Sequence, residues 1–286
     1  MNGIPTGPSD LPPVLPPQPA PADPVNRRRW WIHLVLITTY ILAVGIIGKV
    51  RGETHGPALS HTPRGLLIVS GVELAIFGLV FGLAILVSRA SRDDLWLHWR
   101  GGFWPVPLGI GYSIAIRLMI FTVVIAVSLG LLATQMMTPQ TLREFFYDNR
   151  PTVEAIVDVS AMRQDPVYFW LVLTVVSFGV AGLREELWRS AFLGGLRKLW
   201  PQYFGTRTGQ VIAVLIASMI FGFAHLRMGL LAAVMAGLIG LGLGLVMVWH
   251  RSIWPAVVAH GMFDATSLAG LPWLAERLHG FQINGP

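Results

Sequence analysis

The chain has 286 residues, of which 53% are hydrophobic and only 13% are charged. A soluble domain carries about 25% charged residues, so this sequence lacks the polar side chains needed to cover a water-exposed surface. The formal net charge is +6. The basic residues flank apolar segments and form no single stripe, which argues against nucleic acid as a partner and favours lipid headgroups. The absence of cysteine excludes disulfides, thiolate metal sites and a cysteine nucleophile.

Residues 1–28 form a segment rich in proline. Nine of the 20 prolines lie within the first 26 residues, among few large apolar side chains. Such a segment cannot bury enough apolar surface to offset its loss of conformational entropy. We therefore predict a disordered or polyproline II tail. Residues 29–286 are predicted to form a multi-pass membrane domain.

Seven apolar segments follow the tail, and each approaches the length of about 20 residues that a helix needs to cross a bilayer. They cover residues 31–48, 66–87, 108–133, 167–183, 210–224, 230–249 and 253–271, and the fourth can extend further. Because a helix satisfies its own backbone hydrogen bonds in lipid, we predict an all-α polytopic bundle of about seven spanning helices, with a range of six to eight.

The connections between these segments indicate an orientation. Lys and Arg are more frequent on the side that carries the N-terminus, so we predict a cytoplasmic N-terminus. In a bacterium, such an integral multi-pass protein would lie in the plasma (inner) membrane. The mixed charges and tryptophans of residues 93–100 further predict a short helix at headgroup level.

Two glycine patterns predict helices that pack closely, because small residues let backbones approach each other. They are Gly78-x-x-x-Gly82 and Gly240-x-Gly242-x-Gly244. We expect both to serve packing and neither to have a direct function.

Ionisable side chains within the apolar segments are the functional candidates, since one at membrane depth costs about 2.5 to 3.5 kcal/mol on insertion scales. They are Glu73, Arg117, Glu185, Glu186, Arg189, His225, His260 and Asp264. Glu73 and Arg117 lie near the middle of their segments, where mutual pairing would neutralise both. We therefore favour a structural role for these two.

Glu185 and Glu186 are adjacent, and Arg189 follows at a spacing that lets it pair with either on a helix. One carboxylate can be held ionised by the arginine while the other serves as a general base. The alternative is an interfacial ion-pair cluster at a helix end.

His260 and Asp264 are four residues apart and share one helix face. Asp264 can orient His260, or both can bind one metal ion. His225 closes another apolar segment. A lone histidine at such a place is more often a satisfied polar residue, but two histidines and a carboxylate beside a glutamate pair predict a site that activates water.

Residues 167–271 resemble the core of the intramembrane CAAX-protease and bacteriocin-processing family, which includes prenyl-protein endopeptidases. That family carries Glu-Glu-x-x-x-Arg, Phe-x-x-x-His and His-x-x-x-Asn/Asp motifs on successive core helices. Phe221 to His225 fits the second motif, and His260 to Asp264 fits the third.

The first motif of the family is imperfect in this chain. Glu185 and Glu186 match it, but the family's arginine position falls on Ser190, and Arg189 comes one residue earlier. This departure puts the role of Arg189 in doubt and favours a competing hypothesis, a non-catalytic scaffold or bacteriocin-immunity protein of the same fold.

The resemblance implies an intramembrane endopeptidase acting on a membrane-tethered peptide or protein, with membrane lipid as its other partner. It implies that Glu185, assisted by His225, activates water, while His260 and Asp264 stabilise the oxyanion. Glu186 would support or orient the site.

The resemblance leaves the cofactor open, because the family has been interpreted both as metalloproteases and as metal-independent glutamate proteases. The expectation is no cofactor, or one divalent metal ion such as zinc held by Glu185, His225, His260 and Asp264. The His-Glu-x-x-His signature of zinc proteases is absent. A transporter that uses intramembrane acids as a proton relay is a third class, but no inverted repeat is visible. The oligomeric state is not determined by the sequence.

Overall fold

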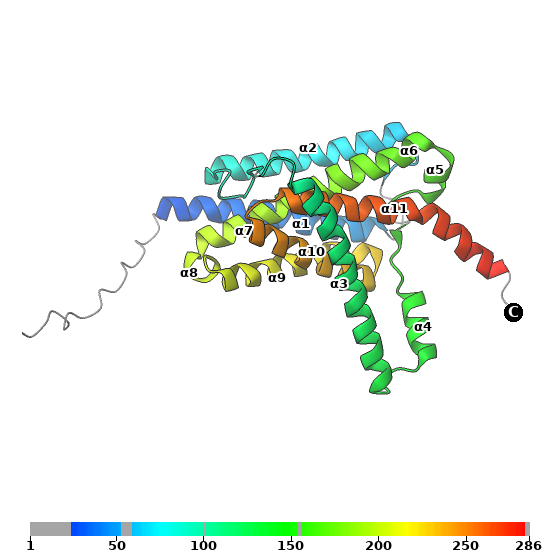
Figure 1. Ribbon diagram of the computed structural model, residues 1–286. Helices are drawn as coiled ribbons and strands as arrows, with labels where there is room; N and C mark the ends of the chain where they lie inside the picture. Colours follow the sequence, from blue (N-terminus) through cyan, green and yellow to red (C-terminus); the bar gives the residue numbers. More distant parts are fainter. Residues whose placement is uncertain (1–23, 53–58, 100, 154–155, 284–286) are drawn as a thin grey trace, which may run out of the picture.

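The computed structural model describes residues 24–52, 59–99, 101–153 and 156–283, and over these residues it contains helices joined by turns (Figure 1). The helices are α1 (Pro24–Gly52), α2 (Pro63–Ser88), α3 (Pro105–Ala133), α4 (Pro139–Asp148), α5 (Val159–Gln164), α6 (Pro166–Leu171), the π-helix η2 (Val172–Glu185), α7 (Glu186–Leu199), α8 (Pro201–Phe204), α9 (Arg207–Ala224), the 3-10 helix η3 (Leu226–Met228), α10 (Leu230–His250) and α11 (Trp254–Ile283). The predicted all-α class is confirmed. The tail predicted over residues 1–28 lies outside the described residues as far as residue 23, and α1 begins at Pro24.

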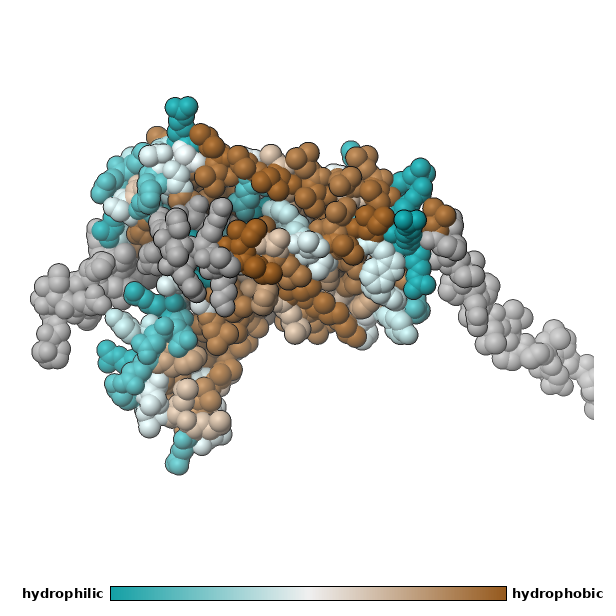
Figure 2. All heavy atoms as spheres, turned by 180° about the vertical axis from the view of Figure 1, so that it is seen from behind, coloured by the Kyte–Doolittle hydropathy of each residue, from teal (hydrophilic) through white to brown (hydrophobic). Residues whose placement is uncertain are grey.

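Six helical segments of the described chain are long and apolar enough to cross a membrane. They are Val25–Ile47, Pro63–Ser88, Pro105–Ala133, Pro166–Leu199, Arg207–Ala224 and Leu230–His250. The fourth combines α6, η2 and α7, so the predicted extension beyond residue 183 is confirmed. The seventh predicted segment forms the start of α11, which is not among the six. Figure 2 shows a broad band of hydrophobic side chains between two more hydrophilic ends.

The helices α1, α2, α9, α10 and α11 run roughly along one common direction, with α7 among them (Figure 1). The helix α3 crosses this direction, and its second half extends away from the bundle. Its buried residues all come before its last 13 residues and are Pro105, Gly109, Ser113, Ile116 and Ile120. Only the start of α3 therefore contributes to the core that surrounds α7.

The core is centred on α7, whose aromatic side chains contact the surrounding helices. The Trp188 ring stacks on Phe192 and Phe221, with centroids 5.7 and 6.5 Å away. Its indole N–H donates to the carbonyl of Ile37 on α1 at 3.0 Å. The buried His33 of α1 adds a second tie, because its Nε2 lies 3.1 Å from the carbonyl of Ala191. These contacts fix the position of α7, which carries part of the candidate site.

The prediction of a short helix at headgroup level over residues 93–100 is wrong for residues 93–99, and residue 100 lies outside the described residues. Residues 91–99 form turns and irregular backbone, in which Leu95 and Trp96 are buried. The Leu95 carbonyl accepts a hydrogen bond from the Ser190 hydroxyl, and the Arg197 guanidinium lies 3.7 Å from the centroid of the Trp96 ring. Contacts with α7 thus hold this segment against the bundle in place of a regular helix at its surface.

The two glycine patterns differ in outcome. A methyl group built on Gly240, Gly242 or Gly244 of α10 would lie 2.5 to 3.1 Å from side chains of α9 and α3, so this pattern does permit close packing. A methyl group built on Gly78 or Gly82 of α2 would have no neighbouring atom within 4 Å. The prediction of close packing is therefore wrong for α2 within this chain.

We expect Gly222→Ala to destabilise the protein by about 1 to 3 kcal/mol, the usual cost of overpacking. The new methyl group would lie 2.6 Å from the backbone carbonyl of Ala233, so α9 and α10 would have to move apart. Thermal unfolding in detergent measures the effect. The matched control is Gly78→Ala, whose new methyl group would contact no other atom. The higher helix propensity of alanine should stabilise this variant by up to about 1 kcal/mol. Equal unfolding midpoints for the two variants would contradict this account.

Candidate active site

The two adjacent glutamates lie at a junction between two kinds of helix. Glu185 ends the 14-residue π-helix η2, and Glu186 begins α7. Stretches of π-helix are rare and are frequently found at functional sites. Gly182 lets α11 approach η2, because a methyl group there would lie 2.9 Å from the carbonyl of Val257. The sequence thus brings the backbone of α11 next to the turn that precedes the glutamates.

Glu186 is fully buried, and both of its carboxylate oxygens have partners. Its Oε1 lies 2.9 Å from Nδ1 of His260 on α11. Its Oε2 forms an ion pair with Arg189, which is also fully buried. The Arg189 guanidinium lies 4.8 Å from the centroid of the Phe221 ring on α9. Glu186 therefore joins α7 and α11 through its two oxygens, although the ion pair of Oε2 with Arg189 is not a hydrogen bond.

Glu185 has one engaged oxygen and one less restricted oxygen. Its Oε1 accepts a hydrogen bond from Nη2 of Arg184 at 2.7 Å. Its Oε2 lies 3.7 Å from Nε2 of His260, which is too long for a direct hydrogen bond. The lone pairs of Oε2 can therefore accept a proton from another group.

His260 is enclosed by carboxylates. Its Nδ1 faces Glu186, while its Nε2 lies 3.7 Å from Glu185 and 3.8 Å from Oδ2 of Asp264. Because a carboxylate only accepts hydrogen bonds, Nδ1 carries a hydrogen and donates it to Glu186. The same contact fixes the orientation of the ring, with Nε2 between the other two carboxylates.

His225 ends α9 beside this cluster. Its Nδ1 lies 2.7 Å from the carbonyl of Phe221, so Nδ1 is the donor and Nε2 of the neutral ring keeps a lone pair. The Phe221 ring contacts both histidines, with centroids 4.5 Å from His225 and 6.1 Å from His260. The structure thus groups Glu185, Glu186, Arg189, His260 and Asp264, and His225 contacts the same Phe221 ring as His260.

The predicted pairing of Glu73 with Arg117 is wrong. Glu73 forms an ion pair with Arg184, the residue before Glu185. Arg117 instead donates to the carbonyl of Phe263 at 2.6 Å and lies 4.2 Å from the centroid of its ring. Sequence reasoning missed Arg184 because it assigned that arginine to a connection. The possible extension of the fourth apolar segment was the signal that would have placed it inside a helix.

The donor set does not fit a metal ion. In the part of the chain that the structure describes, no group of three or more His, Asp or Glu side chains is arranged so that it could hold one. The carboxylates of Glu185 and Glu186 face the guanidinium groups of Arg184 and Arg189, whose charge disfavours a nearby cation. The metalloprotease interpretation therefore has no support in this geometry.

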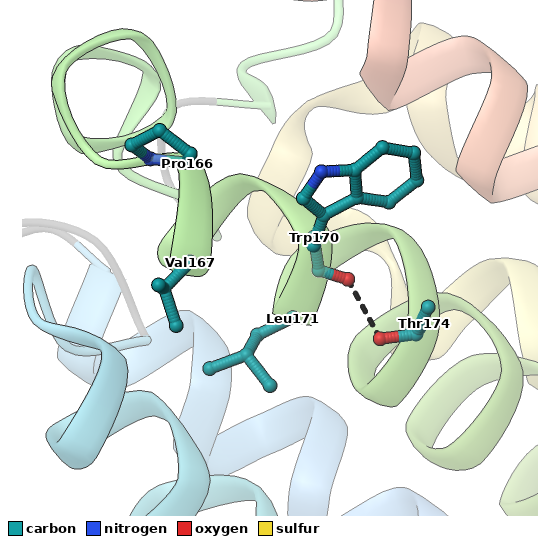
Figure 3. A pocket seen from close by; sticks show the side chains of 5 residues that line it. All are labelled: Pro166, Val167, Trp170, Leu171 and Thr174. Carbon is teal, nitrogen blue, oxygen red and sulfur yellow. Dashed lines mark hydrogen bonds between the residues drawn. The ribbon is translucent and has the colours of Figure 1, made fainter.

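Two shallow surface pockets lie elsewhere. One of about 410 Å³ is lined by Gly101, Phe103, Trp104 and Pro107. The other, of about 280 Å³, is formed at the start of α6 and η2 by Pro166, Val167, Trp170, Leu171 and Thr174 (Figure 3). Neither pocket includes a residue of the cluster, which lies inside the bundle.

Comparison with known proteins identifies one part of the chain. The sequence pattern of the family described as type II CAAX prenyl endopeptidase Rce1-like matches residues 166–266. No curated protein and no solved structure matches the chain. The matched part begins at α6 and ends within α11, so it contains all six predicted site residues, while its apolar helices make this an integral membrane protein. Residues 166–266 of this chain are therefore a domain of the Rce1-like family of type II CAAX prenyl endopeptidases.

Proposed function

We propose that the protein is a membrane-embedded endopeptidase that hydrolyses a peptide bond in a membrane-tethered peptide or protein. One observation carries this proposal. Within the matched residues, Arg184 holds one oxygen of Glu185, and the other oxygen faces Nε2 of the buried His260 at 3.7 Å. A carboxylate and an imidazole this close together can act on one water molecule and one carbonyl group that lie beside the pair.

Glu185 acts as the general base in this proposal. Its Oε2 takes a proton from water, and the water oxygen forms a bond to the scissile carbonyl carbon. The C–N bond then breaks, and the proton passes from Glu185 to the leaving amine, so that an acid and an amine are released. His225 assists, since its Nε2 lone pair can accept a hydrogen bond from the same water.

His260 stabilises the oxyanion that forms when water adds to the carbonyl. With a second proton on the ring, Nε2–H donates to the oxyanion, while Nδ1–H remains bonded to Glu186. Asp264 lies on the same face of α11 and supports the positive charge of the imidazolium. Such preoriented donors are effective in a site that excludes water, because they need not reorganise during the reaction.

The position of the cluster inside apolar helices favours a substrate that is already in the membrane. A lipid anchor or a transmembrane helix would bring the scissile peptide to this depth, whereas a free peptide would have to leave water first. The chemical identity of the anchor does not follow from these residues.

The test is cleavage of a library of membrane-tethered peptides by the purified protein in detergent, with and without a metal chelator. We expect cleavage of tethered peptides, much slower cleavage of the same sequences without an anchor, and equal rates in the presence of chelator. Loss of activity with chelator, restored by zinc, would contradict the metal-independent mechanism. A well-folded protein that cleaves no library member would contradict the endopeptidase and favour the scaffold hypothesis.

A further inference from the structure

Arg184 bridges two carboxylates that come from different helices. Its Nη1 is paired with Glu73 of α2, and its Nη2 donates to Glu185 at 2.7 Å. Adjacent residues of a regular α-helix do not face each other. Arg184 can reach Glu185 because both end the π-helix η2, whose wider turn reduces the angle between neighbouring side chains.

An ionised carboxylate at the position of Glu73 costs free energy. Glu73 lies in the middle of α2, an apolar spanning segment, where an ionised carboxylate needs a partner. Arg184 supplies that partner, but it also serves Glu185, so one positive charge is shared by two negative ones. An arginine that only had to neutralise Glu185 would not require a second carboxylate on α2.

We propose that Glu73 is a positioning residue for the peptidase site: it holds one side of the Arg184 guanidinium, so that the other side binds a single oxygen of Glu185. This inference rests on the proposed role of Glu185 as general base. The guanidinium is planar with donors in a fixed fork, so fixing Nη1 also fixes the direction of Nη2. The remaining oxygen of Glu185 stays directed at His260.

The consequence of losing Glu73 follows from the same geometry. A guanidinium released from α2 would favour the two-pronged contact that arginine forms with carboxylates. Both oxygens of Glu185 would then accept hydrogen bonds from Arg184. Glu185 would still be present and the protein would still be folded. The reactive oxygen of Glu185, however, would be occupied and turned away from His260.

The variant that tests this is Glu73→Gln, which keeps the size of the side chain and removes its charge. We expect kcat to fall about 10-fold to 100-fold, as for other small misplacements of a reacting group. We expect KM to stay within about twofold, because the lost interaction acts in the transition state and not in substrate binding. Glu73→Asp, which keeps the charge on a shorter side chain, should give an intermediate kcat.

The matched control is Asp94→Asn, which also converts a carboxylate in an ion pair to an amide. Asp94 pairs with Lys198 of α7 at 2.6 Å and has no contact with the cluster. We expect its kcat to remain within about twofold of the unmodified protein. Equal losses of kcat in Glu73→Gln and Asp94→Asn would assign the effect to general destabilisation and overturn the proposal.

A second readout does not depend on cleavage. The carboxylate ¹³C NMR signal of Glu185, identified by its absence in Glu185→Gln, should shift in Glu73→Gln and stay unchanged in Asp94→Asn. An unchanged signal in folded Glu73→Gln would overturn the positioning role even if kcat fell. If the unmodified protein cleaves no peptide, the proposed function fails, and this signal still decides whether Glu73 sets the environment of Glu185.

Discussion

Glu185→Gln is expected to lower kcat for peptide cleavage by about 10²-fold to 10⁴-fold, the range attributed to general acid–base catalysis. The amide keeps the shape of the side chain, and its oxygen can still accept the hydrogen bond from Arg184. It cannot take a proton from water at neutral pH. The free energy of unfolding should change little. The unfolding midpoint in detergent, measured on the same preparations, therefore separates the chemical effect from misfolding.

Two comparisons make this result specific. Glu144→Gln changes an exposed carboxylate on α4 whose partner is Gln140, and it should leave kcat unchanged. Glu185→Asp keeps the acid but withdraws it from His260, and it should retain more activity than the amide. If Glu185→Gln kept a tenth or more of the activity, another group would have to be the base, and the mechanism proposed above would be wrong.

The parts of the structure that could be predicted from the sequence depend on contacts within one helix. The apolar segments indicate spanning helices because length and composition alone decide whether a helix can cross a bilayer. The spacing predicted that Arg189 pairs with Glu185 or with Glu186, and it pairs with Glu186. His260 and Asp264 share a face as predicted, with 3.8 Å between Nε2 and Oδ2.

Contacts between helices could not be predicted in this way. Glu73 pairs with Arg184 and not with Arg117, because the partner depends on which helices lie side by side and at what depth. The hydrogen bond between Arg184 and Glu185 depends on a π-helix, and a long apolar segment gives no periodic signal that distinguishes a π-helix from an α-helix.

Arg189, which comes one residue before the arginine position of the family's first motif, depends both on spacing within its helix and on contacts between helices. Its offset from the family's arginine position put the role of Arg189 in doubt. In α7 it pairs with Glu186, whereas Ser190 at the family's arginine position donates to the carbonyl of Leu95. Arg189 thus contacts the cluster although it comes one residue before the family's arginine position. Its removal should therefore affect stability.

Arg189→Leu is expected to destabilise the protein by about 3 to 5 kcal/mol, because it leaves the carboxylate of Glu186 buried without its ion-pair partner. Both side chains are fully buried, so water cannot replace the lost partner. Leucine also removes the contact of the guanidinium with the Phe221 ring, which adds a smaller loss. The measurement is the free energy of unfolding in detergent, compared with that of the unmodified protein.

The double variant Glu186→Gln, Arg189→Leu identifies the cause of that loss. Glutamine carries no charge, and its oxygen can still accept the hydrogen bond from Nδ1 of His260, so we expect most of the stability to return. Activity need not return with it, because His260 would lose the negative charge that supports its protonated form. A double variant as unstable as Arg189→Leu would show that arginine packing, and not the unpaired carboxylate, dominates. A single variant that costs less than about 1 kcal/mol would mean that the pair is solvated, contrary to its full burial.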